Sequence, residues 1–106
     1  MSEQVKKSTR VPIIGEWKNG VDLYLKWCTE GMSIKETTPE GSVYHFFGIP
    51  FSVHSKDGSE IVRWYGEHIQ AMAGSKQFRY EIKGDNLYLT DLEQEGKILV
   101  LERVWK

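Results

Sequence analysis

Residues 77–92 read QFRYEIKGDNLYLTDL, and this stretch decides the class of the fold. In its first half, apolar Phe78, Tyr80 and Ile82 alternate with polar residues, which is the pattern of a strand with one buried face. A Gly-Asp-Asn sequence at 84–86 then supplies residues that favour a tight turn, and a second β-type run follows it. The stretch therefore predicts a hairpin whose first strand presents Phe78, Tyr80 and Ile82 to the interior of the domain.

Similar short runs, separated by turn sequences, extend along most of the chain. Turn residues recur roughly every 8–12 positions, a spacing that is typical of antiparallel β-structure. Residues 21–28 and 68–73 also allow a helical interpretation, but no segment offers a convincing helix of about ten residues or more. We therefore expect an all-β domain. The turn sequences are Asn19-Gly20, Thr29-Glu30-Gly31, Pro39–Ser42, Gly48-Ile49-Pro50, Lys56–Ser59, Gly74-Ser75 and Glu93–Gly96.

Length and local composition define the domain organisation. The chain has 106 residues, which suffices for one domain and is too few for two. Residues 1–10 are polar and charged, and we expect them to form a flexible tail. The β-type pattern begins at Val11, so residues 11–106 are predicted to form the single domain.

Charge and hydropathy exclude several classes of partner. Fourteen basic and fifteen acidic residues give a net charge of −1, so we expect neither nucleic acid nor an anionic membrane as a partner. No stretch approaches the roughly 20 apolar residues of a membrane span. Residues 1–10 hold no apolar run that would form a signal peptide. We therefore expect a cytoplasmic location for the chain as it stands, or a periplasmic or secreted one if a signal peptide has been removed.

The residue types that usually carry catalysis or bind metals are scattered along the sequence. His45, His54 and His68 fall in three separate segments with no close pair, which argues against a metal or haem site. Cys28 is the single cysteine and has no histidine beside it, so a structural thiol in a reducing compartment is favoured. No glycine-rich phosphate-binding pattern is present. We therefore expect a non-enzymatic protein with no catalytic residue, no metal and no cofactor.

Two short motifs at opposite ends of the chain sharpen the fold prediction. Gly15-Glu16-Trp17 opens the first β-type run, and Arg103 stands in the last one. A glycine-x-tryptophan in the first strand together with a late arginine resembles lipocalin-like (calycin) β-barrels, in particular small bacterial domains of this kind. The resemblance covers residues 11–106 and implies that Arg103 packs over Trp17 and closes one end of a barrel. A guanidinium suits this role because it can lie flat on an indole ring while it hydrogen-bonds nearby carbonyls.

The expected fold is therefore a small antiparallel up-and-down β-barrel of about eight strands. A closed barrel also hides the strand edges of a chain rich in β-branched and aromatic residues. The chain is shorter than a typical secreted lipocalin and shows no helix at its C-terminal end. Fatty-acid-binding proteins share the barrel but need a helical lid between their first two strands, and residues 21–28 are too short to form it.

Function is predicted from the aromatic residues of the strands, because alternate residues of each barrel strand point inward. The resemblance to lipocalins implies a small hydrophobic or amphipathic ligand, held in an aromatic-lined interior. Arg63 is preferred over Arg79 as an interior cation for a ligand carboxylate, since Arg79 alternates with the inward set. Register leaves open whether Trp64, or Arg63 with Tyr65, points inward. The predicted ligand-binding residues are Tyr44, Phe46, Arg63, Trp64, Phe78 and Tyr80.

The alternative is that these rings simply fill a small barrel and leave no cavity. The protein would then be an interaction module, such as an inhibitor, an immunity protein or an accessory factor. Aromatic and arginine side chains are enriched at protein interfaces. Under this alternative, Trp64 with Tyr65, or Trp27 with Tyr24, are the candidates for an exposed docking cluster.

Overall fold

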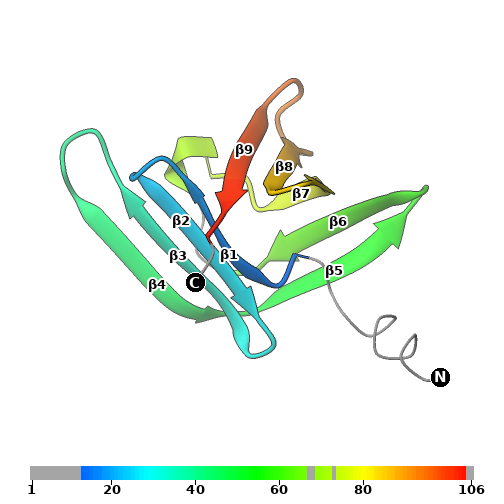
Figure 1. Ribbon diagram of the computed structural model, residues 1–106, viewed down its shortest axis with the longest axis horizontal. Helices are drawn as coiled ribbons and strands as arrows, with labels where there is room; N and C mark the ends of the chain where they lie inside the picture. Colours follow the sequence, from blue (N-terminus) through cyan, green and yellow to red (C-terminus); the bar gives the residue numbers. More distant parts are fainter. Residues whose placement is uncertain (1–12, 67–68, 73, 105–106) are drawn as a thin grey trace.

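The computed structural model describes residues 13–66, 69–72 and 74–104, which form one antiparallel sheet of nine strands (Figure 1). The tail predicted at residues 1–10 lies outside the described residues. One short 3₁₀ helix, η1 (Gln70–Met72), lies in the connection between β6 and β7. The strands are β1 (Gly15–Asn19), β2 (Leu23–Cys28), β3 (Gly31–Thr37), β4 (Val43–Ile49), β5 (Phe51–Lys56), β6 (Ser59–Trp64), β7 (Gln77–Lys83), β8 (Asn86–Asp91) and β9 (Ile98–Arg103).

The order of strands in the sheet is β4-β3-β2-β1-β9-β8-β7-β6-β5. The first and last strands of the chain therefore pair with each other, and the two edges of the sheet are β4 and β5, which follow one another in the sequence. Figure 1 shows β4 and β5 diverging from their junction, so that the sheet curls into a half-barrel. The predicted all-β, antiparallel up-and-down architecture is confirmed, with nine strands in place of about eight.

The divergence of β4 from β5 has a local cause in residues 48–50. Gly48 has a φ of 66°, a conformation that glycine adopts readily and other residues rarely do. Pro50 has no N–H to donate to a strand ladder. The chain therefore changes direction between the two strands, and β5 continues away from β4 instead of pairing with it.

The hairpin between β5 and β6 illustrates how turn residues set the register. Lys56 pairs with Ser59, so the turn itself consists of Asp57 and Gly58. These two residues have φ values of 53° and 80°, as a type I′ turn requires at both of its central positions. The turn predicted at residues 56–59 is confirmed.

The two segments that allowed a helical interpretation differ in outcome. Residues 23–28 form strand β2, in which every second residue is buried. Residues 70–72 form the single turn of η1. Nowhere in residues 13–66, 69–72 and 74–104 is there a helix with the length and apolar character that crossing a membrane requires.

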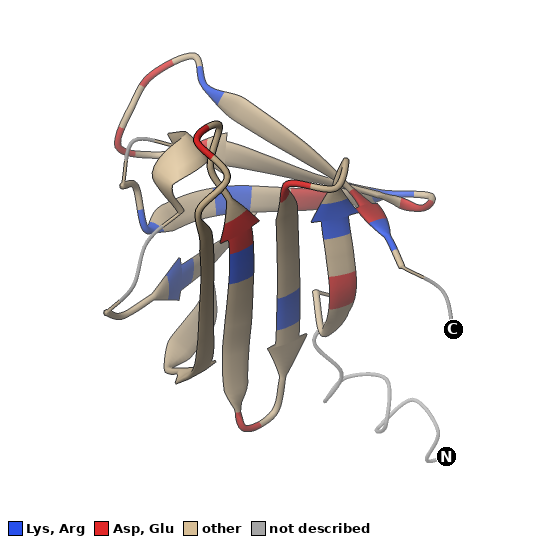
Figure 2. Cartoon of the chain, turned by 90° about the vertical axis from the view of Figure 1, so that its left-hand side faces the viewer, with Lys and Arg blue, Asp and Glu red and all other residues tan. Residues whose placement is uncertain are grey.

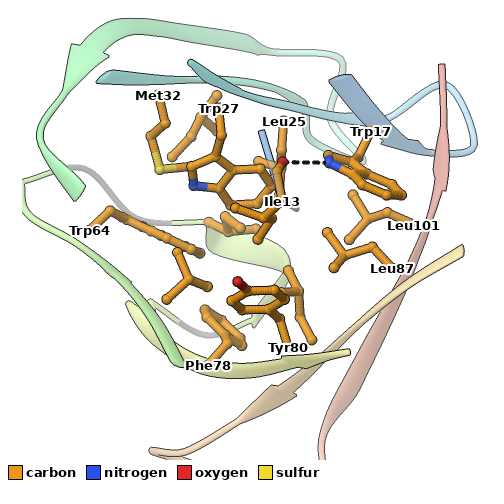
Figure 3. Packing of buried hydrophobic residues seen from close by; sticks show 14 of the residues in the cluster. Ile13, Trp17, Leu25, Trp27, Met32, Trp64, Phe78, Tyr80, Leu87 and Leu101 are labelled. Atoms are coloured by element: carbon orange, nitrogen blue, oxygen red, sulfur yellow. Dashed lines mark hydrogen bonds between the residues drawn. The ribbon is translucent and has the colours of Figure 1, made fainter. Parts of the chain in front are cut away.

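A continuous hydrophobic core fills the concave side of the sheet (Figure 3). It also takes in Ile13, which precedes β1, and Ile69 and Met72 from the β6–β7 connection. Side chains from both halves of the sheet, from the segment before β1 and from the β6–β7 connection thus meet in one cluster. The largest fully buried side chains are Trp17, Trp27, Trp64, Phe78, Ile13, Leu25, Met32, Ile34, Ile69, Leu87, Leu89 and Leu101.

Candidate functional site

Trp17 and Arg103 face each other across the β1–β9 pair. The guanidinium carbon of Arg103 lies 4.1 Å from the centre of the Trp17 ring, a cation–π distance. Trp17 is fully buried, and its indole N–H donates a hydrogen bond to the carbonyl of Ile13 at 3.0 Å (Figure 3). A Cβ atom at Gly15 would stand only 2.7 Å from Nη1 of Arg103. The glycine of the glycine-x-tryptophan motif therefore leaves the space that the arginine side chain occupies.

Two of the aromatic residues predicted to line a ligand cavity, Trp64 and Phe78, pack against each other. Trp64 and Phe78 are fully buried, with ring centres 5.1 Å apart and nearly parallel planes. The Trp27 ring lies 6.0 Å from Trp64 on the other side. Neither buried indole N–H, of Trp27 or of Trp64, has an acceptor among the described residues. Ring packing, rather than polar contact, therefore holds this part of the core.

Of the two registers left open for β6, the structure has the one with Trp64 inward, so the prediction of Arg63 as an interior cation is wrong. Neighbouring residues of a strand point to opposite faces, and Trp64 takes the buried one. Arg63 is exposed on the outer face, where its guanidinium carbon lies 5.2 Å from the centre of the Tyr65 ring. Arg63 therefore cannot supply an interior cation for a ligand.

The two aromatic clusters predicted as docking sites, Trp64 with Tyr65 and Trp27 with Tyr24, are not where most exposed apolar side chains lie. Trp27 and Trp64 are fully buried, Tyr24 is half-buried, and Tyr65 is exposed. Strand β4 carries more of the exposed apolar residues than any other described strand. The exposed large apolar residues are Val21, Val43, Tyr44, Phe47, Tyr65, Leu92, Ile98 and Val100.

Both faces of β4 carry aromatic rings. On the concave side, Tyr44 and Phe46, both predicted as ligand-binding residues, lie with ring centres 6.4 Å apart and almost parallel planes. On the outer side, His45 and Phe47 lie 4.1 Å apart, and Phe47 is 71% exposed. Phe46 is partly buried against the hydrophobic core, whereas Tyr44, His45 and Phe47 are exposed.

The free edge of β4 also presents main-chain hydrogen-bonding groups. The N–H of Thr38 donates to the carbonyl of Ser42 at 2.8 Å, just beyond the end of the β3–β4 ladder. Hydrogen-bonded pairs alternate along an antiparallel ladder, so Tyr44 is the next residue of β4 to bond with β3. Val43 and His45 therefore direct their N–H and C=O groups toward the free edge, where no described strand pairs with them.

The other edge of the sheet, β5, has a different character. Its last five residues, 52–56, read Ser-Val-His-Ser-Lys, so it ends in polar residues and a lysine. Polar and charged residues on an edge strand discourage pairing with another chain. Residues 43–47 of β4 read Val-Tyr-His-Phe-Phe and carry no acidic residue, lysine or arginine. Of the two described edge strands, β4 is therefore the one that combines unpaired main-chain groups with exposed aromatic side chains.

A basic hollow lies beside β4 on the outer face. The register of β1 to β4 places Lys18, Tyr24, Lys35 and His45 in one row across the four strands. These residues line a hollow of about 440 Å³, together with Gly20, Val21 and Leu23. Figure 2 looks onto this side of the molecule and shows basic residues in blue on several of its strands.

Tyr24, in the middle of this row, is held in its neutral form. Its hydroxyl donates a hydrogen bond of 2.5 Å to Oε1 of Glu16, and Lys26 lies 3.9 Å from the other oxygen of the same carboxylate. Burial and, secondly, the hydrogen bond to Glu16 raise the pKa of Tyr24 to about 12. The row therefore contributes the positive charges of its lysines and no negative charge.

A hollow of about 740 Å³ opens where β6 leaves β7. The pairing of these strands ends at Glu60 and Tyr80, so the last residues of β7 are not paired on that side. Burial and, secondly, Glu60 raise the pKa of the Tyr80 hydroxyl. Tyr80 is thus the one predicted ligand-binding residue that lines this hollow. The lining consists of Gly58, Ser59, Glu60, Arg79, Tyr80, Glu81 and Ile82.

A further hollow of about 600 Å³ lies between the end of β3 and η1. The buried carboxylate of Glu36 accepts hydrogen bonds from the main-chain N–H groups of Gln70 at 2.9 Å and Ala71 at 2.8 Å. Both oxygens are therefore engaged in fixing the β6–β7 connection to β3. This carboxylate serves the structure and is not free to bind a ligand.

Reactive groups are not brought together in the part of the chain that the structure describes. No group of three or more histidine, cysteine, aspartate or glutamate residues there is arranged to hold a metal ion. The thiol of Cys28 donates to the carbonyl of Gly31 at 3.2 Å. His45 and His54 lie on different strands, and His68 falls outside the described residues.

Comparison with known proteins yields no match. No protein-family model, no curated protein and no solved structure matches this chain. The function is therefore inferred from the geometry of the strands and their side chains.

Proposed function

We propose that this protein is an interaction module that binds an extended segment of a partner protein by strand addition to β4. The observation that carries the proposal is the free edge of β4, which presents unpaired main-chain groups at Val43 and His45 and aromatic rings on both faces. Strand addition to an exposed sheet edge is a recurrent mode of peptide recognition, in which main-chain hydrogen bonds supply affinity and side-chain contacts supply specificity.

The packing of the core supports this function over a ligand buried inside the sheet. Trp64 and Phe78 are fully buried and stacked on each other. A ligand placed between them would have to displace side chains whose packing is worth about 3–5 kcal/mol for each large ring. The exposed rings of Tyr44 and Phe47 can instead be covered without disturbing any buried side chain.

A neutral extended peptide tests strand addition directly. The probe is a peptide of about ten alternating glutamine and threonine residues, long enough to span an average strand. Binding should slow amide hydrogen exchange at Val43 and His45, which direct their N–H groups to the edge. The same peptide with alternate amides N-methylated keeps its side chains but lacks donors along one edge, and it should bind weakly. Protection confined to other strands, or none at all, would contradict the proposal.

A matched pair of proline variants gives a second test. His45→Pro removes an outward donor of β4 without removing a hydrogen bond to β3, and it should abolish binding of the probe. The N–H of Tyr65 donates to the carbonyl of Pro50, so alternation directs the N–H of Ser55 to the free edge of β5. Ser55→Pro therefore makes the same change at the other edge and should leave binding intact.

Binding of a small hydrophobic or amphipathic ligand is the second candidate function, and the hollow between β6 and β7 favours it. Its volume of about 740 Å³ falls within the roughly 300–1,000 Å³ of small-molecule sites. Ile82 and the ring of Tyr80 supply apolar surface, and Arg79 supplies a cation for a carboxylate. The resemblance to lipocalin-like domains points the same way.

Calorimetric titration with a medium-chain fatty acid and with an aromatic carboxylate tests this candidate. Ile82→Glu introduces a charge into the hollow and should abolish binding. Ile98→Glu adds the same charge at an exposed position of β9 outside the hollow, and it should have no effect. Equal binding by both variants would place the ligand elsewhere.

A further inference from the structure

We infer that the segment added to β4 is acidic, with carboxylates on the face that continues the outer surface of the sheet. This inference rests on the proposed function, since it concerns the chemistry of the strand that β4 receives. It is carried by the row formed by Lys18, Tyr24, Lys35 and His45, which ends at the free edge of β4.

The geometry of an added strand extends this row by one position. The residue opposite His45 would have its Cβ about 5 Å from that of His45, on the same face. Successive strands are about 4.8 Å apart, so a glutamate at this position lies two strands from Lys35, within reach of its long side chain. Val43 lies two residues along the strand from His45 and shares this outer face. Alternate residues of the added strand therefore all meet this surface.

The positive charge near the edge is not neutralised within the described part of the chain. Lys35 is exposed and forms no ion pair with a described residue. The carboxylate of Glu36 is buried on the opposite face and bound to the amides of Gln70 and Ala71. The carboxylate of Glu16 is taken up by Tyr24 and Lys26. Glu102 lies opposite Lys18 at the far end of the row, on β9, so the charge left without a nearby described carboxylate is that of Lys35, next to the free edge. An acidic partner strand thus supplies the charge complementary to Lys35.

Charge also argues against the other available occupants of the edge. If a second copy paired its β4 with this one, the outer surfaces of both copies would become continuous, and the lysines of the second copy would add to the positive charge of the first. Residues 1–12 of this chain contain three basic residues and one acidic residue, so their net charge has the same sign as the outer face. Neither occupant matches the surface as an acidic segment does.

Three peptides of equal length test the inference by fluorescence anisotropy. Each alternates threonine with a second residue, which is glutamate, glutamine or lysine. The glutamate peptide should bind about three- to tenfold more tightly than the glutamine peptide, the range expected for one or two exposed ion pairs. The lysine peptide should bind most weakly. The preference for glutamate should shrink between about 50 mM and 300 mM NaCl, because salt screens exposed charges.

A charge-reversal variant tests whether Lys35 is the source of the preference for the glutamate peptide. Lys35→Glu should invert the order of the glutamate and lysine peptides while the glutamine peptide binds as before. Lys83→Glu makes the same change in net charge on β7, away from β4, and should leave the order unchanged. An inverted order in Lys83→Glu, or an unchanged order in Lys35→Glu, would overturn the inference.

The outcomes separate the inference from the proposed function. Equal binding of the glutamate and glutamine peptides, with protection at Val43 and His45, overturns the acidic preference and leaves strand addition standing. No binding by any peptide and no protection at these amides contradicts strand addition itself. A dimer seen by light scattering, and converted to monomer by His45→Pro, identifies a second copy as the occupant and overturns the inference.

Discussion

The guanidinium of Arg103 occupies the space in which a side chain at Gly15 would begin. Its Nη1 atom lies 2.7 Å from the position that a Cβ of residue 15 would take, while its Cζ stacks 4.1 Å above the Trp17 ring. The three residues come from the first and last strands, which pair with each other. This contact therefore joins the first and last described strands.

Gly15→Ala should destabilise the protein by about 1–3 kcal/mol, because it adds both a clash and backbone strain. Residue 15 has a φ of 141°, which disfavours any side chain. Gly20→Ala is the control, since Gly20 has a φ of 62° but open space around its Cβ position. It should lose only about 1–2 kcal/mol, from strain alone. Equal losses in urea denaturation would show that the contact with Arg103 is unimportant.

Arg103→Ala should lower the free energy of unfolding by about 1–3 kcal/mol, since it removes a stacked and partly buried side chain. Arg103→Lys should recover only part of this, because an ammonium cannot lie flat on the Trp17 ring. Arg79→Ala, at an exposed position, serves as the control. A change within about 0.5 kcal/mol for Arg103→Ala, the range of ordinary surface substitutions, would remove the stacking argument.

Two phenylalanine substitutions should separate folding stability from peptide binding. Phe78→Ala removes a fully buried ring that stacks on Trp64 and should cost about 3–5 kcal/mol of stability. Phe47→Ala removes a ring that is 71% exposed and should change stability by less than about 0.5 kcal/mol. It should nevertheless weaken peptide binding to β4. If Phe47→Ala lost both binding and stability, Phe47 would be a structural residue, and its role in binding the peptide would be contradicted.

Glu36→Gln should destabilise the protein by about 1–3 kcal/mol, because one carboxylate oxygen that accepts a main-chain N–H becomes an amide donor. Hydrogen exchange at Gln70 and Ala71 should accelerate, since Glu36 is their acceptor. Glu40→Gln, at an exposed position beyond β3, is the control and should leave both amides unchanged. Unaltered exchange in Glu36→Gln would show that other contacts hold the β6–β7 connection.

Stability should fall at high pH because of Tyr24. Its pKa is raised from the ordinary value of 10.0 to about 12 in the folded state, so the folded protein holds this proton more tightly than the unfolded chain. The stabilisation is complete below pH 10 and is lost as the pH rises from there through 12. Tyr24→Phe should reduce the dependence of unfolding free energy on pH between about 9.5 and 11.5. The pKa of Tyr80 is also raised, so its ionisation lowers stability over the same direction of pH change. Tyr80→Phe is therefore measured alongside, to separate its effect from that of Tyr24.

The architecture was predictable because local signals and global fold agree. The alternation at Phe78, Tyr80 and Ile82 and the turn at residues 56–59 identify strands and hairpins without knowledge of the whole. The divergence of β4 from β5 was not predictable, since glycine and proline at 48–50 signal a bend but not its direction.

The side-chain environments were harder to predict, because they depend on register. A shift of one residue exchanges the faces of a strand, and Arg63 was accordingly expected on the wrong side. The sequence of residues 43–47 did indicate a possible binding edge, since it contains no lysine, arginine or acidic residue. Charged side chains of this kind normally protect an edge strand from pairing with another chain. That indication could be recognised only once the sheet order identified β4 as an edge.

The most direct test of strand addition to β4 is amide hydrogen exchange at Val43 and His45, measured with and without the glutamate–threonine peptide. These two residues direct their N–H groups to the free edge, so exchange at both should slow by about tenfold or more when an added strand accepts their hydrogen bonds. Exchange at Tyr44, which bonds to β3, should change little. Unchanged exchange at Val43 and His45 under saturating peptide would contradict the proposal that β4 receives a partner strand.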